Sequence, residues 1–141
     1  DDAFESTVST IIAIMLTVII SFVGVSSAGI GTKANPMQDS RIDVVKSQQI
    51  FKDYTVTYGE CLDNKCTDPE WTIFSSSDKK KVVEFNGNVV YNNMNSSLKI
   101  QFVYNDSDDY WALSYMALNG TAMDSNGAAL LLNYLCSDYF N

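Results

Sequence analysis

The sequence contains no histidine, the residue that most often serves as a general base and as a ligand for metal ions. Without histidine the chain cannot assemble a Ser-His-Asp or Cys-His nucleophilic site, and it lacks the attachment motif of c-type haem. Three cysteines without histidine are also too few for a structural zinc site. We therefore expect no enzymatic activity, and no catalytic residues, metal or cofactor.

Basic residues are scarce. Nine Lys and Arg stand against 17 Asp and Glu, which gives a net charge of −8 and a pI near 4.2. Binding to the phosphates of nucleic acids needs basic patches, so we expect no nucleic-acid contact. No basic residue precedes Lys33, whereas a secretory signal peptide opens with a basic region. The N-terminal segment is therefore not typical of a signal peptide.

Charge is missing altogether from residues 6–32, and residues 8–25 are mostly apolar and lack proline. About 20 apolar residues in a helix span the ~30 Å hydrocarbon core of a bilayer. The pattern predicts a hydrophobic transmembrane helix over residues 1–28. Small residues and glycines at 26–31, followed by Asn35-Pro36, predict a linker over residues 29–39. Residues 40–141 are then long enough for one extracellular globular domain.

Glu5 stands directly in front of this uncharged run. An ionisable group at the edge of a membrane helix is costly and is functional by default. We expect Asp1 to be an N-terminus created by processing. A new N-terminus, a glutamate at the fifth position and about 20 apolar helical residues together resemble the type IV pilin superfamily.

The resemblance implies that the helix rests in the cytoplasmic (inner) membrane and later packs against identical helices in a filament core. It implies that Glu5 neutralises the N-terminal amine of Asp1 in a neighbouring subunit. A carboxylate buried in an apolar bundle needs such a partner. The residues assigned to helix packing are Ile11, Ile12, Met15, Leu16, Ile19, Phe22 and Val23.

The function implied is that of a structural subunit in a type IV pilus-like surface filament, a homopolymer of identical chains. The other reading is a single-pass membrane-anchored extracytoplasmic binding domain, in which Glu5 lies among the lipid headgroups. Adhesion, motility, DNA uptake and secretion all stay open as roles of a filament. The stretch from Asp43 to Phe85 also resembles a small extracytoplasmic domain found behind membrane anchors in many bacterial proteins. That resemblance rests on residues 44–46, 57–60, 69–71 and 82–85.

Helix signals open and close the domain. A capping-box-like pattern begins at Ser40, and apolar residues at helical spacing predict a helix reaching Phe51. Thr57 and Glu60 form a capping box for a second short helix, which should end before Pro69. Residues 124–127 can start a terminal helix.

Between the second and the terminal helix, alternating patterns predict strands over residues 71–74, 81–85, 89–91, 98–104 and 110–118. Asn86-Gly87 predicts a hairpin turn, and Asn119-Gly120 predicts another. The fold class is thus α+β: an N-terminal hydrophobic transmembrane or filament-core helix, then a small domain with an antiparallel β-meander and short helices.

The cysteines allow several states. A disulfide from Cys136 to Cys61 or to Cys66 would join the second helix to the terminal one, a local Cys61–Cys66 loop would be strained on a helix, and free thiols also stay open. Among the many aromatic residues, Tyr54, Tyr58, Tyr139 and Phe140 are candidates for a subunit interface.

Overall fold

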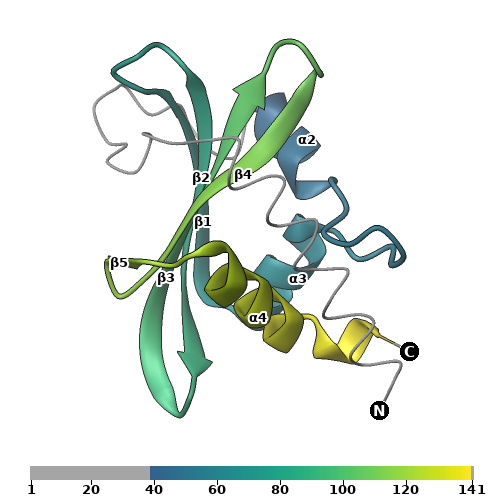
Figure 1. The fold of residues 1–141 in the computed structure, drawn as a ribbon, viewed down its shortest axis with the longest axis vertical. Coiled ribbons are helices and arrows are strands. Elements are labelled where there is room, and N and C mark those ends of the chain that lie inside the picture. Colours follow the sequence, from purple (N-terminus) through teal and green to yellow (C-terminus); the bar gives the residue numbers. More distant parts are fainter. Residues whose placement is uncertain (1–38, 141) are drawn as a thin grey trace.

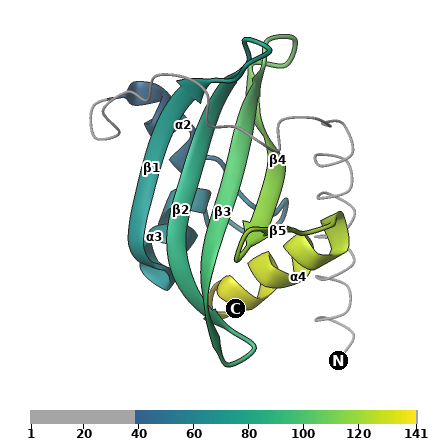
Figure 2. The same cartoon turned by 90° about the vertical axis from the view of Figure 1, so that its left-hand side faces the viewer.

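A computed structural model describes residues 39–140 of the chain. These residues form an α+β domain in which five antiparallel strands, paired in sequence order, make one sheet. Three α-helices lie on one side of that sheet (Figure 1, Figure 2). The strands are β1 (Thr67–Ser75), β2 (Lys81–Tyr91), β3 (Met94–Asn105), β4 (Tyr110–Leu118) and β5 (Thr121–Ala122). The helices are α2 (Ser40–Lys46), α3 (Tyr58–Lys65) and α4 (Ser125–Leu135), followed by the 3₁₀ turn η1 (Ser137–Tyr139).

Helix α2 is shorter than its sequence pattern predicts. It ends at Lys46, five residues before Phe51, although Ile50 and Phe51 are buried as the pattern requires. The Ser47 hydroxyl donates to the Val44 carbonyl at 2.8 Å, which satisfies one of the last helix carbonyls. The chain then turns back, and its continuation pairs with the segment that precedes α3 through a bridge between residues 49 and 57. Tertiary pairing therefore replaces the last predicted turn of the helix.

Helix α3 begins where the sequence predicts. The Thr57 side chain accepts a hydrogen bond from the Glu60 backbone N–H at 3.2 Å, as a capping box requires. The helix ends at Lys65, before the Thr67-Asp68-Pro69 segment. The terminal helix α4 is capped by Asp124, whose carboxylate accepts from the Gly127 N–H at 2.8 Å.

The hairpin predicted at Asn86-Gly87 is wrong. Strand β2 runs straight through both residues, and Gly87 pairs with Leu98 across the ladder. The turn lies instead at Asn92 and Asn93, whose φ values of 52° and 62° fit a tight two-residue β-turn between β2 and β3. The turn predicted at Asn119-Gly120 is confirmed, with φ values of 52° and 81°.

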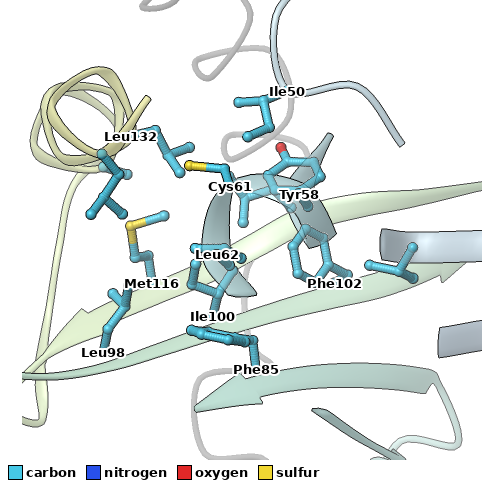
Figure 3. Packing of buried hydrophobic residues seen from close by; sticks show 14 of the residues in the cluster. Ile50, Tyr58, Cys61, Leu62, Phe85, Leu98, Ile100, Phe102, Met116 and Leu132 are labelled. Atoms are coloured by element: carbon cyan, nitrogen blue, oxygen red, sulfur yellow. The ribbon is translucent and has the colours of Figure 1, made fainter. Parts of the chain in front are cut away.

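The core lies between the sheet and the helices. Phe85, Ile100 and Phe102 point from the sheet toward Leu62 of α3 and Leu132 of α4, and all five side chains are buried (Figure 3). The Tyr58 ring meets the Phe102 ring edge-on, with centroids 4.8 Å apart.

The predicted fold class needs a correction. Among residues 39–140, no helix has both the length and the apolar character to cross a membrane. The longest is α4, whose 11 residues measure about 16 Å at 1.5 Å per residue, half of what a bilayer requires. The described fold is therefore a small α+β domain with three helices, without the membrane-length helix of the prediction. The segment predicted as that helix, residues 1–28, lies outside the described residues, as does nearly all of the linker.

Candidate interaction surface

A groove of about 450 Å³ lies near the end of the sheet where β2 turns into β3. Its walls come from β2 and β3, from the start of β1 and from the ends of α3 and α4. The lining includes the polar side chains of Lys65, Asn88, Asn95 and Asp138 beside the apolar side chains of Val90 and Tyr134. Such a mixed lining suits a polar ligand or a protein surface better than an apolar cofactor.

An ion pair closes one side of the groove. The Lys65 ammonium binds the Asp138 carboxylate, and this hydrogen bond raises the pKa of Lys65. The same ammonium lies 5.7 Å from the centre of the Tyr139 ring, and Asn64 Nδ2 donates to the Tyr139 hydroxyl at 3.4 Å. These contacts hold η1 against the end of α3.

Exposed apolar side chains lie in the wall of the groove and next to it. Val90, Leu130 and Tyr134 are 54%, 48% and 50% exposed, and together they are called the α4 patch below. The Tyr134 hydroxyl donates to the Val90 carbonyl at 3.2 Å, and its ring packs edge-on against Tyr91 at 5.2 Å. Leu130 and Tyr134 are four residues apart on α4 and so share one helix face. Exposed apolar side chains grouped beside a groove are typical of an interaction surface.

The sequence did not single out the α4 patch. The predicted terminal helix contains Leu130 and Tyr134 as well as Leu131 and Leu135, but only the latter two are buried. The exposed pair precedes the buried pair by one residue, so the two pairs lie about 100° apart around the helix axis. This angular offset is the sequence signal that distinguishes an exposed pair from a core pair. Val90 gave no sequence signal, because its exposure depends on the strand register.

The structure brings two of the three cysteines together. Cys61 on α3 and Cys136 at the end of α4 are fully buried, and their Sγ atoms lie 2.7 Å apart. The hydrogen bond between them and their burial raise the pKa of the Cys136 thiol. Cys66 caps the C-terminal end of α3 and packs near Gly87 of β2, and burial raises its pKa to about 12.

Burial distinguishes Tyr58 from the other three aromatic residues predicted for a subunit interface. Tyr58 is buried in the core, where the loss of hydration raises its pKa, so its assignment to an interface is wrong. The rings of Tyr54 and Phe140 are 4.7 Å apart and cover the core together with partly buried Tyr139.

The opposite face of the sheet carries a buried carboxylate. Glu84 accepts from Gln101 Nε2 at 3.0 Å and from Asn86 Nδ2 at 2.7 Å, and Lys99 Nζ lies 3.9 Å from its Oε1. Beside it, Phe74, Val82 and Val103 form a small buried cluster. A carboxylate buried on a sheet is tolerable because these donors replace its water.

The sequence-predicted assembly residues cannot be placed on this surface. Glu5, Asp1 and the seven helix-packing residues, Ile11, Ile12, Met15, Leu16, Ile19, Phe22 and Val23, all lie outside the described residues. Within residues 39–140, no three Cys, Asp or Glu side chains gather in a way that would hold a metal ion. No protein-family model, curated protein or solved structure matches the chain.

Proposed function

We propose that this chain is a structural subunit of a type IV pilus-like surface filament, a homopolymer that displays the α+β domain on the cell surface. The observation that carries the proposal is the position of Glu5, one residue before 27 residues without any charge. Before assembly, the uncharged segment is held in the cytoplasmic membrane. During assembly it leaves the lipid and packs against the same segment of other subunits.

The chemistry of Glu5 explains why assembly would be specific. A carboxylate moved from the membrane surface into an apolar filament core loses its hydration, which costs several kcal/mol unless an opposite charge compensates. When processing makes Asp1 the N-terminus, its α-amine in a neighbouring subunit supplies that charge, and no Lys or Arg lies nearer to Glu5 in the sequence than Lys33. Pairing with the amine therefore fixes how far one subunit is displaced along the next.

The apolar contacts do not provide this specificity, because lipid tails are as apolar as the side chains of the segment. Close packing of Ile, Leu, Val and Phe side chains adds van der Waals attraction between subunits without choosing one register over another. The charge pair then selects one arrangement among several of similar packing energy.

Replacing Glu5 tests this proposal directly. In the Glu5→Ala variant we expect surface filaments to be lost, while the chain accumulates in the membrane at the wild-type level. The Asp2→Ala variant is the matched control, because it removes a nearby acid of the same charge and should leave filaments in place. Normal filaments from Glu5→Ala, counted by negative-stain microscopy of sheared cell-surface material, would remove the main support for the proposal.

A single-pass anchored binding domain is the second candidate function, and the groove beside the α4 patch is the observation that favours it. In that case the domain acts as a monomer, and Glu5→Ala has almost no effect. The Leu130→Glu variant would instead abolish recognition of the partner, since it places a charge on the exposed apolar face of α4. The two functions are therefore separated by which of these two substitutions causes a defect.

A further inference from the structure

We propose that Cys61 and Cys136 form a disulfide that joins α3 to the end of α4, and that Cys66 stays a free thiol. This disulfide would form within one folded domain, whether or not the chain assembles into filaments.

The two sulfur atoms lie close enough for a bond to form between them. Cys61 Sγ and Cys136 Sγ lie 2.7 Å apart, so no other atom fits between them. A disulfide bond measures about 2.05 Å, so a movement of about 0.7 Å shared by two side chains would close it. Figure 3 shows the Cys61 sulfur directed from α3 toward Leu132 on α4, which is the side on which Cys136 follows four residues later.

The surroundings hold the two sulfur atoms in place. Cys61 and Cys136 are each 0% exposed and belong to the main core cluster. Just beyond them, the Lys65–Asp138 ion pair and the contact of Asn64 with Tyr139 join the same two elements. Bringing the sulfur atoms together therefore needs no further ordering of the chain, because other contacts already fix α3 against the end of α4.

Cys66 is a poor partner for either cysteine. It lies five positions after Cys61, and at 100° per residue the two side chains leave α3 in directions about 140° apart. Its Cβ packs toward the sheet, where a Cβ added to Gly87 would lie only 3.1 Å from it. The sequence holds three cysteines, so the pairing of Cys61 with Cys136 leaves Cys66 as one thiol per chain.

The reaction is a thiol–disulfide exchange with a disulfide donor, either a protein or a small molecule. One cysteine loses its proton, and its thiolate attacks a donor sulfur, which releases one donor thiolate and leaves a mixed disulfide. The second cysteine then loses its proton and attacks the protein sulfur of the mixed disulfide. The products are the Cys61–Cys136 disulfide and two donor thiols, so the two electrons lost by the protein reduce the donor.

Burial controls when this happens. The raised pKa of the Cys136 thiol keeps it protonated in the folded chain, and a donor cannot reach either buried sulfur. The exchange is therefore slow on the folded domain and fast while α4 is not yet docked. For the same reason the finished disulfide is protected from reduction.

Peptide mapping tests the proposal on the full-length chain. The chain is reduced and kept in detergent with excess oxidised glutathione, at a urea concentration low enough to open α4 only transiently. It is then denatured, alkylated and digested with trypsin. Cleavage after Lys65 places Cys61 and Cys66 on different peptides, and Cys136 lies on a third. We expect a peptide pair linked through Cys61 and Cys136, with the alkyl group on Cys66.

The Cys66→Ala variant is the matched control and should give the same linked pair with no alkylated cysteine. Wild-type and variant chains should both melt lower after reduction, by roughly 10 °C or more, because the link closes a loop of more than 70 residues. A link that includes Cys66, three alkylated cysteines, or equal melting temperatures before and after reduction would each overturn the proposal.

Discussion

Gln48 pairs with the backbone of Trp111 as a neighbouring strand would. Its Nε2 donates to the Trp111 carbonyl at 2.9 Å, and the Trp111 N–H donates to its Oε1 at 3.2 Å. Strand β4 is paired with β5 only at Ala117 and Leu118. One side chain from the segment after α2 therefore satisfies the outer edge of β4 at a point where none of the strands within residues 39–140 lies. An edge strand protected in this way is less able to pair with another chain.

We expect Gln48→Ala to lower the free energy of unfolding by about 1–2 kcal/mol, since it removes two hydrogen bonds that connect segments 63 residues apart. The control is Gln49→Ala, which removes one exposed bond from Gln49 Nε2 to the Tyr54 carbonyl and should cost less than about 1 kcal/mol. Urea unfolding measures both. If both variants lost the same free energy of unfolding, the two hydrogen bonds to Trp111 would stabilise the domain no more than the single exposed bond of Gln49 does.

Gly87 is expected to resist substitution because of packing rather than turn geometry. A Cβ at this position would lie 2.8 Å from the Phe85 ring and 3.1 Å from the Cys66 Cβ. Gly87→Ala should therefore lower stability by about 1–3 kcal/mol, as overpacking of a core does.

Gly127→Ala is the matched control for Gly87→Ala. Its added Cβ would lie 3.3 Å from the Asp124 side chain, and alanine favours the first turn of α4. We expect the free energy of unfolding of Gly127→Ala to stay within about 0.5 kcal/mol of the wild-type value or to rise. A Gly87→Ala variant as stable as Gly127→Ala would contradict the close approach of β2 to the end of α3.

Local signals in the sequence predicted the parts of the fold that local hydrogen bonds determine. The Thr57 capping box places the start of α3, and the Asp124 cap places the start of α4, because each side chain satisfies a donor within three residues. The same logic failed at Asn86-Gly87. That dipeptide has high turn propensity, yet the ladder with β3 continues through it, while the chain reverses at Asn92 and Asn93.

Contacts between segments that are distant in the sequence could not be predicted from local sequence patterns. The sequence left Cys136 with two candidate partners, and only the docking of α4 on α3 brings Cys61 to it. The exposure of Val90 beside Tyr134 depends in the same way on strand register and helix placement. Glu5 differs from these residues in two ways. It lies outside the described residues, and its proposed role involves a contact with another subunit.

Alkaline pH should weaken the domain through Cys66. Its pKa is about 12 in the folded chain against an ordinary value of 9.0, because burial opposes the thiolate. The unfolded chain therefore releases this proton at lower pH than the folded chain does. Its contribution is fully present below pH 9 and is lost as the pH rises toward 12, at up to about 1.4 kcal/mol per pH unit.

The comparison that isolates this effect is urea unfolding of wild-type and Cys66→Ala chains between pH 7 and pH 11. The variant should lose stability less steeply above about pH 9. The remaining slope is expected from Tyr58, whose pKa is also raised by burial. Parallel curves for the two chains would mean that Cys66 does not titrate as a buried thiol.

Polymerisation of the chain at the cell surface is tested most directly by electron microscopy of sheared surface material. Wild-type cells are sheared, the released material is negatively stained, and an antibody against the folded α+β domain carries a gold label. The proposal predicts thin fibres labelled regularly along their length. Label that stays with the membrane fraction as single particles, with no labelled fibres, would contradict it.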